Sequence, residues 1–311
     1  MAVCRARAPL LGVPTAFVLS GGGSYGAMQV GMLRALAARG VQPDLVVGAS
    51  VGALNGAWFA ASPDTQGVDG LTRLWRELEA HEVFPVVRGR LRPWRLGRHN
   101  HVFPLRPWPL LLGALGRRDH LVSNRAFRAF LQERLPLKRL EAGRLPLHVV
   151  ATDLLDGQMV AFREGDAIPA VLASSALPGV FPPVSLNGRL LVDGGVADNT
   201  PVDHAVELGA TEIYVLPAGF GRRLASAPKK ALGVGAHSLG LALEQRLITA
   251  VHRTQPGVTL RVAPSPPVRV LPLDFATTSE LIDTAEALTS DWLDAGAPEG
   301  EEAVTGEPGT S

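Results

Sequence analysis

The sequence predicts an α/β fold with three layers, in which helices cover both faces of a mostly parallel central sheet. Short apolar segments alternate with longer segments of helical periodicity along most of the 311 residues. The strand-like segments are apolar at consecutive positions, which is typical of strands buried on both faces. With 46% hydrophobic residues, the chain can also build a full core.

In the first half of the chain, glycine and proline mark where the predicted elements end. Gly40 ends one helix, and Ser62 with Pro63 ends another. The predicted strands here are apolar runs that stop at glycine or serine, and the predicted helices carry apolar residues at helical spacing. The strands are residues 15–20 and 44–49, and the helices are residues 26–39, 51–61, 68–80 and 127–135.

In the second half, turn and capping residues define the elements. Asp156 and Gly157 form a turn signal between two segments that can pair as a hairpin. Thr200 is a candidate N-cap, with Pro201 in the first turn of the helix that follows. The predicted strands are residues 147–152, 158–162, 189–192, 211–216 and 258–262, and the helices are residues 168–177, 201–208, 233–252 and 277–293.

Composition excludes several classes of protein. The net charge is +1, so no overall field favours nucleic acid, and no nucleic-acid partner is expected. Cys4 is the only cysteine and cannot form an intrachain disulfide, which favours a cytoplasmic location. No uninterrupted apolar run reaches the roughly 18 residues that predict a transmembrane helix. Residues 8–19 could pass for a signal peptide, but prolines interrupt them and a buried strand explains them better.

A glycine-rich loop follows the first predicted strand and opens the first helix. Backbone amides at such a place point toward one spot and can hold an anion. An oxyanion hole, a dinucleotide site through the Gly-x-Gly-x-x-Gly spacing, and simple close packing are all open interpretations. Asp44 has nearly the spacing of a ribose-binding acid, but it precedes the second strand instead of following it. The candidate oxyanion residues are Gly21, Gly22, Gly23, Ser24 and Gly26.

Ser50 stands between the second predicted strand and the helix after it, within the pattern Gly48-Ala49-Ser50-Val51-Gly52. A sharp strand-to-helix turn would expose the serine hydroxyl, and Gly48 and Gly52 would relieve crowding around that turn. The simpler alternative is a serine that caps a helix between glycines that permit close packing. The strand before and the helix after favour a nucleophile.

Asp193 follows the short strand at residues 189–192 and precedes Gly194 and Gly195. An Asp-Gly pair is a common turn, and on its own that is the simpler interpretation. A serine nucleophile nevertheless requires a base. A carboxylate is a weak base for a hydroxyl, so such a pair works only if the oxyanion hole lowers much of the barrier.

Taken in order, these motifs resemble those of the patatin-like phospholipases, a family of serine acyl hydrolases with a Ser–Asp dyad. The likeness covers residues 15–216 and extends to the segments 173–178 and 181–183. Asn199 and Pro201, just after the aspartate, also match. The resemblance implies a patatin-like α/β/α fold.

The same resemblance implies roles for individual residues. Ser50 is expected to be the nucleophile and Asp193 its activating base, while amides of Gly22, Gly23 and nearby residues hold the oxyanion. Tyr25 stands where the family usually has Arg or Lys, and this departure bears on substrate preference and rate.

A histidine-based triad and a metal site are the two alternatives to this dyad. An ordinary Ser-His-Asp hydrolase would place a histidine downstream of the aspartate, at His204, His237 or His252. Each lies in or near a predicted helix and none at a strand end, so surface or packing roles are expected. No histidine, cysteine or carboxylate spacing indicates a metal, and we expect no metal and no other cofactor.

A segment rich in Arg, Trp and Pro, at residues 81–120, interrupts the α/β pattern and contains no acidic residue between positions 88 and 118. Arginine with tryptophan suits an anionic membrane interface, where it would act as a flap near the substrate. A plain proline-stiffened loop and nucleic-acid binding are the alternatives. The candidate flap residues are Arg88, Arg92, Trp94, Arg95 and Trp108.

The expected organisation is a catalytic core at residues 13–216 that carries this flap. Residues 217–295 supply C-terminal helices and a strand packed on the same domain, and residues 296–311 form a disordered acidic tail. The predicted function is hydrolysis of phospholipids, lysophospholipids or neutral acyl esters through an acyl-enzyme. The expected location is cytoplasmic, with peripheral contact to the inner face of the membrane. The alternatives are a weak or inactive membrane-binding regulatory protein and a nucleotide-binding protein.

Overall fold

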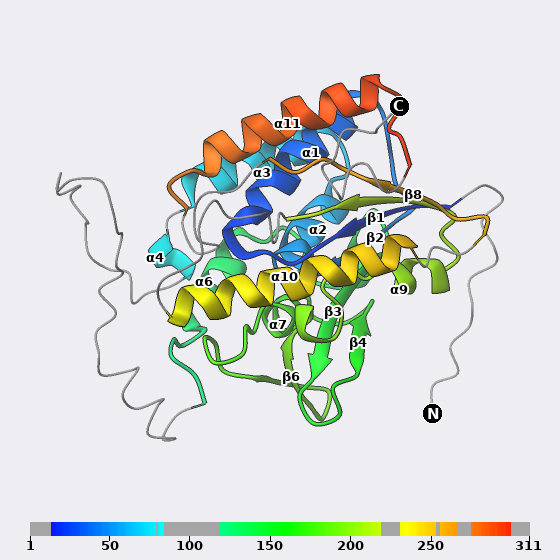
Figure 1. Cartoon of the computed structure of the whole chain (residues 1–311). Helices are drawn as coiled ribbons and strands as arrows, with labels where there is room; N and C mark the ends of the chain where they lie inside the picture. The colour runs from blue at the N-terminus through cyan, green and yellow to red at the C-terminus, as the bar shows by residue number, and fades with distance from the viewer. Residues whose placement is uncertain are drawn as a thin grey trace.

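The computed structural model describes residues 14–78, 80–83, 119–218, 231–252, 256–266 and 275–299. These residues form the three layers that the sequence predicts, with a central sheet between two sets of helices (Figure 1).

The middle layer is an eight-stranded sheet with the order β5-β6-β3-β2-β1-β7-β8, and β4 pairs with β3. Parallel pairing joins β1 (Thr15–Leu19), β2 (Leu45–Ala49), β3 (Leu147–Asp153), β7 (Glu212–Leu216) and β8 (Thr259–Val262). Antiparallel pairing adds β4 (Met159–Phe162), β5 (Val184–Leu186) and β6 (Arg189–Asp193) at one side. The prediction of a mostly parallel sheet is confirmed.

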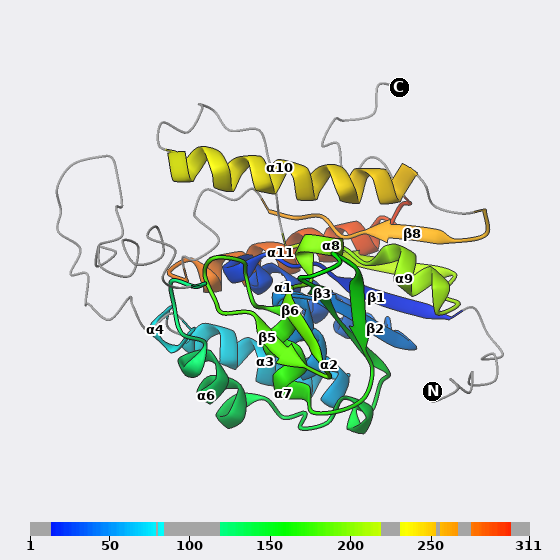
Figure 2. The same cartoon turned by 90° about the horizontal axis from the view of Figure 1, so that it is seen from below.

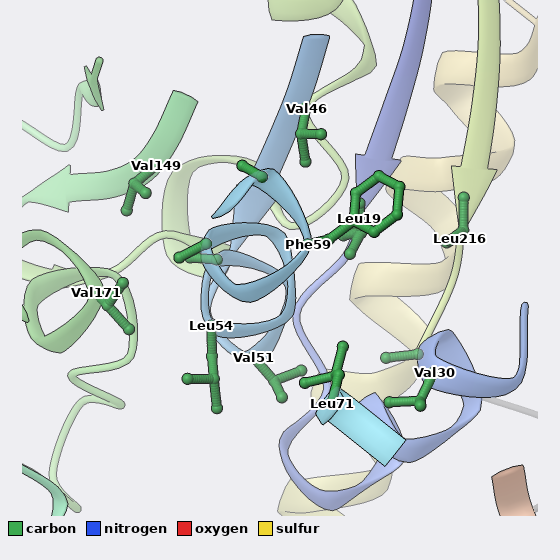
Figure 3. Close-up of a cluster of buried hydrophobic side chains, with 14 of the residues drawn as sticks. Leu19, Val30, Val46, Val51, Leu54, Phe59, Leu71, Val149, Val171 and Leu216 are labelled. Atoms are coloured by element: carbon green, nitrogen blue, oxygen red, sulfur yellow. The ribbon is translucent and has the colours of Figure 1, made fainter. Parts of the chain in front are cut away.

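Side chains along the strands alternate between two apolar clusters, one on each face of the sheet. In β1, Phe17 and Leu19 belong to the larger cluster, whereas Ala16 and Val18 belong to the smaller one. Figure 3 shows part of the larger cluster, where side chains of α2 lie between the sheet and neighbouring helices. The helices that bury side chains in this cluster are α1 (Gly26–Ala38), α2 (Val51–Ala61), α3 (Thr65–Glu77), α6 (Arg125–Arg134), α7 (Ala167–Ser174) and α11 (Thr278–Asp294).

The opposite face carries α9 (Val202–Glu207) and the C-terminal third of α10 (Ala231–His252), which pack on the smaller cluster. In α10 the contacting side chains are Leu247, Ala250 and Val251. Figure 2 shows α10 beyond α8 (Gly195–Asp198) and α9, on the other side of the molecule from α2, α3 and α7.

Most predicted elements appear within a few residues of their expected bounds, and the differences have local causes. Helix α3 begins at Thr65 because Asp64 caps it by accepting the Gly67 amide at 2.9 Å. Thr200 is not an N-cap: Pro201 occupies that position without a side-chain cap, and the Thr200 amide donates to Asp198 instead. The short elements β5, α8 and α4 (Ala80–Val83) have too few residues to show a period, and the sequence did not predict them.

The C-terminal segment joins the same layers. Strand β8 extends the sheet beside β7, and α11 packs along α1, where Arg39 forms an ion pair with Asp294 at 2.7 Å. Ala297 is buried and its amide donates to the Trp292 carbonyl at 2.9 Å, so ordered packing continues past residue 296, the predicted start of the tail. Residues 300–311 lie outside the described part of the chain.

Within the described ranges, no helix combines the length and the apolar character that crossing a bilayer requires.

A histidine pair joins β3 to α9 far from the motifs discussed above. Nδ1 of His148 lies 3.0 Å from Nε2 of His204. Burial, followed by the proximity of His204 and Arg163, lowers the pKa of His148 from 6.5 to about 4. As the pH falls from 6.5 toward 4, the unfolded chain therefore takes up a proton that the folded chain does not, and stability is lost.

Replacing His148 with Gln should make folding less sensitive to acid, because the replacement does not titrate. Relative to this variant, the wild type should lose up to about 3 kcal/mol of unfolding free energy between neutral pH and pH 4. Urea unfolding at several pH values measures this. The raised pKa values of Asp193 and Asp198 act in the opposite direction over the same range, so the difference between the two proteins is the informative quantity. Parallel stability curves would contradict the assignment.

Candidate active site

The sheet topology brings the three predicted motifs to one place. Strands β1, β2 and β3 are parallel neighbours, so the glycine loop after β1 and Ser50 after β2 leave the same edge of the sheet side by side. Strand β6 runs antiparallel to β3 on its other side and ends at Asp193, which lies opposite Ala151. Residues distant in the sequence thereby become neighbours.

Ser50 occupies the sharp turn between β2 and α2. Its backbone has φ 54° and ψ −123°, a conformation that residues with a Cβ rarely adopt. The serine hydroxyl Oγ donates a hydrogen bond of 2.6 Å to Oδ2 of Asp193. The two side chains that the sequence analysis expected to meet are therefore in direct contact.

Asp193 is buried, and both of its carboxylate oxygens accept hydrogen bonds. Oδ2 accepts from Ser50, and Oδ1 accepts from the backbone amide of Gly195 at 2.8 Å. Burial raises the pKa of Asp193 to about 6, and the two hydrogen bonds, which favour the ionised form, offset only part of that effect. This carboxyl group is therefore more basic than an ordinary aspartate.

Ser174, at the end of α7, links the two sides of the site. Its Oγ accepts the Ser50 amide at 2.8 Å and donates to the Val150 carbonyl at 2.5 Å. Its own carbonyl accepts the Gly194 amide at 3.0 Å. One buried residue thus holds the turn that carries Ser50 and the segment that follows Asp193. Sequence reasoning noted the segment 173–178 only as part of a resemblance and gave Ser174 no role.

Some backbone amides of the glycine loop donate hydrogen bonds within the protein, and others do not. The Gly21 amide donates to the Asn199 carbonyl at 3.1 Å, and the Gly26 amide donates within the first helical turn, to Gly23. Neither can also hold an oxyanion, which corrects the prediction for these two residues. In the part of the chain that the structure describes, the amides of Gly22 and Gly23 have no hydrogen-bond acceptor. The amides of Gly22 and Gly23 are therefore the proposed oxyanion donors, and the role expected for Ser24 stays a prediction.

Gly21 and Gly26 act through their size instead. A Cβ on Gly21 would lie 2.5 Å from Oδ1 of Asn199 and 3.0 Å from Cβ of Ser50. A Cβ on Gly26 would overlap Val51 and lie 2.9 Å from the Trp75 ring. The absence of side chains lets the loop lie against the turn that carries Ser50.

The remaining motif glycines allow backbone segments to touch. A Cβ on Gly48 would overlap the Gly52 backbone, one on Gly52 would overlap the Leu19 carbonyl, and one on Gly194 would overlap the Val150 carbonyl. Gly195 is likewise crowded, by Asn199 and the Asp193 carboxylate. The close-packing interpretation is therefore correct for these glycines, and it is compatible with the chemical one.

The dinucleotide interpretation finds no support in this geometry. Asp44, the candidate ribose-binding acid, accepts the backbone amide of Thr15 at 2.8 Å. Thr15 begins β1, so this carboxylate lies at the amino ends of β1 and β2, whereas the glycine loop lies at their carboxyl ends.

In the part of the chain that the structure describes, no histidine forms a hydrogen bond with Ser50 or Asp193. His204 is in α9, where its ring contacts His148 and Glu207. The side chains of His237 and His252 are outside the described part of the chain, as are all five candidate flap residues: Arg88, Arg92, Trp94, Arg95 and Trp108. Among the described residues, no group of three His, Cys, Asp or Glu side chains could hold a metal ion.

A family model described as patatin-like phospholipase matches residues 17–206. The match covers more than half of the chain and includes Ser50 and Asp193. The chain belongs to the patatin-like phospholipase family, a family of lipid hydrolases.

Two of the relatives that this chain is similar to illustrate how much of each protein is matched. Lysophospholipase NTE1 of Cryptococcus neoformans is 30% identical over 218 residues, which cover 68% of this chain and 11% of that protein. Patatin-like phospholipase domain-containing protein 7 of Rattus norvegicus is 29% identical over 212 residues, covering 68% of this chain and 14% of the relative. The chain thus corresponds to a small part of each relative.

The fold likeness extends further than the sequence likeness. The crystal structure of VipD from Legionella pneumophila matches with a TM-score of 0.51 over 91% of this chain and 67% of that one, at 16% identity. At this identity the likeness concerns the fold alone.

Substituting Gly52 with Ala should disrupt the site and the fold, because the added methyl meets the Leu19 backbone, which cannot move aside as a side chain can. We expect a loss of several kcal/mol or a failure to fold, measured by thermal unfolding and soluble yield. Gly70 on α3 is the matched control. A Cβ there meets nothing closer than 3.5 Å, so Gly70→Ala should stabilise the protein by about 0.5–1 kcal/mol. Equal effects at the two positions would contradict this account.

Proposed function

We propose that this protein is a serine ester hydrolase that cleaves acyl esters of lipids through a Ser50–Asp193 dyad. The observation that carries the proposal is the 2.6 Å hydrogen bond from the Ser50 hydroxyl to the buried Asp193 carboxylate. The proposed catalytic unit spans residues 13–216, which include all the motif glycines.

In this mechanism Asp193 removes the hydroxyl proton as Ser50 Oγ attacks the ester carbonyl carbon. The strained turn at Ser50 acts as a nucleophile elbow, since it presents the hydroxyl at the edge of the sheet. The carbonyl oxygen becomes an anion that accepts hydrogen bonds from the amides of Gly22 and Gly23. Collapse releases the alcohol, which takes the proton from Asp193, and leaves an acyl-serine.

Water completes the cycle. Asp193 takes a proton from a water molecule that attacks the acyl-serine, and a second tetrahedral anion forms in the same loop. Its collapse releases the fatty acid and returns the proton to Ser50 Oγ. The two half-reactions use the same base and the same amides.

The environment of Asp193 favours this role. Its raised pKa makes it a better proton acceptor than a solvated aspartate, although still weaker than the serine alkoxide that forms. The oxyanion loop must therefore supply much of the rate, and a single amide donor can contribute a factor of about 10²–10³.

The proposed substrates are phospholipids, lysophospholipids and neutral acyl esters. Membership of a lipid-hydrolase family supports the lipid class, and the name of one relative specifies a lysophospholipase. We propose that the protein meets these substrates as a peripheral protein at the cytoplasmic face of a membrane. A panel of purified lipids, with released fatty acid as the readout, would rank the three substrate groups.

Changing Ser50 to Ala should abolish hydrolysis of a short-chain nitrophenyl ester and labelling by a fluorophosphonate probe, because both need the Oγ nucleophile. Asp193→Asn should lower kcat by at least about 10³-fold while leaving the protein folded. Mass mapping of the labelled peptide identifies the serine. Unchanged turnover in Ser50→Ala, or labelling at another serine, would refute the assignment of Ser50 and Asp193 as the catalytic dyad. A folded wild type that binds liposomes but takes up no probe would favour the regulatory alternative.

The pH profile of kcat/KM should rise with an apparent pKa of about 6, because Asp193 must be ionised to accept the proton. Activity is therefore expected to be full above neutrality and to fall as the pH drops below about 6. Asp198 provides the control, since burial raises the pKa of its carboxyl to about 6 as well. The Asp198→Asn variant should keep the midpoint of the pH profile near 6. If the midpoint disappears in this variant, the titrating group is Asp198 and the assignment to Asp193 is wrong.

A further inference from the structure

A chain of buried polar side chains runs behind the glycine loop, from α3 through α2 to α1. Nε1 of Trp75 donates to Oδ1 of Asn55 at 2.8 Å, and Nδ2 of Asn55 donates to Oε1 of Gln29 at 2.8 Å. Asn55 and Gln29 have no exposed surface, and Trp75 is 1% exposed. Polar groups this deep in an apolar core are costly unless each one is paired.

This hydrogen-bond network ends at Ser20 and Gly26, the two residues on either side of the glycine loop. Nε2 of Gln29 donates to the Ser20 carbonyl at 2.8 Å and to the Leu216 carbonyl at 3.0 Å. The second hydrogen of Asn55 Nδ2 goes to the Gly26 carbonyl at 3.0 Å. Ser20 immediately precedes the loop and Gly26 ends it, so both ends of the loop are held from behind.

Only one orientation of each amide satisfies these contacts. Trp75 can only donate, so the oxygen of Asn55 must face it, and the Asn55 nitrogen must then face Gln29 and Gly26. The Gln29 oxygen faces Asn55, so the Gln29 nitrogen must face the two carbonyls. Turning either amide over would oppose oxygen to oxygen, and the network therefore has a single geometry.

We propose that Asn55 and Gln29 are positioning residues that set the place of the loop amides relative to the Ser50 hydroxyl. Asn55 lies on α2, the helix that begins directly after Ser50, and Gln29 lies on α1, the helix that the loop opens. Their mutual hydrogen bond joins the nucleophile side of the site to the oxyanion side. This inference rests on the proposed function, because it assigns the network to the amides of Gly22 and Gly23.

The test uses Asn55→Leu and Gln29→Met, which keep a side chain of similar length and shape and remove the hydrogen-bonding groups. Each variant should lower kcat on a soluble nitrophenyl ester by about 10- to 100-fold, since a shift of about 1 Å in a catalytic group can cost a factor of about 10². KM should stay within about twofold and the pH midpoint should not move, because the Ser50–Asp193 contact is untouched. The double variant should lose no more than the worse single variant, because the two residues act as one unit.

A structural readout separates this inference from the proposed function. In protein labelled with ¹⁵N-glycine, the amide signals of Gly22 and Gly23 should shift in both variants, while those of Gly188 and Gly209, in turns elsewhere, stay in place. If the wild type shows no Ser50-dependent turnover, the proposed function fails and these shifts alone decide the inference. Unmoved Gly22 and Gly23 signals in a folded variant would overturn it.

Leu131→Ala on α6 is the matched control for loss of stability, because Leu131 is fully buried in the same apolar cluster and lies outside the network. It should lower the melting temperature at least as much as Asn55→Leu and leave kcat within about twofold. An equal fall of kcat in Leu131→Ala would show that general destabilisation explains the effect, and a wild-type kcat in Asn55→Leu would equally refute the proposal.

Discussion

The first turn of helix α2 packs with its backbone directly against the backbone at the carboxyl ends of β1 and β2. This close approach determines the geometry of the site. Side chains at Gly48 and Gly52 would overlap main-chain atoms of Gly52 and Leu19. The chain must therefore turn within one residue, and Ser50 takes the unfavourable φ of 54°. Ser174 holds the strained turn by accepting the Ser50 amide at 2.8 Å.

A buried charge beside that turn makes the site chemically distinct. Asp193 stays ionisable because the Ser50 hydroxyl and the Gly195 amide donate to it, yet burial still raises its pKa to about 6. The fold thus places a buried carboxylate next to the hydroxyl of the half-buried Ser50. Perturbed carboxyl groups of this kind are typical of functional sites.

A second polar feature of the core is the buried hydrogen-bond network of Trp75, Asn55 and Gln29. Asn55 and Gln29 pair the buried Trp75 Nε1–H and the carbonyls of Gly26, Ser20 and Leu216, and the donors and acceptors of the two amides are themselves all paired. Such a network admits one arrangement, whereas apolar packing tolerates several. The glycine loop has few side chains to define its position, and it is the element with the greatest need for such support.

Local patterns in the sequence determined the order and type of nearly all long elements, because apolar runs and glycine stops act within a few residues of each other. They also identified Ser50, Asp193 and the glycine loop as a group. Only the tertiary structure decided which loop amides are engaged, since Gly21 meets Asn199 across 178 positions and Ser50 meets Ser174 across 124. Contacts of that range depend on strand order and register, which no local pattern encodes.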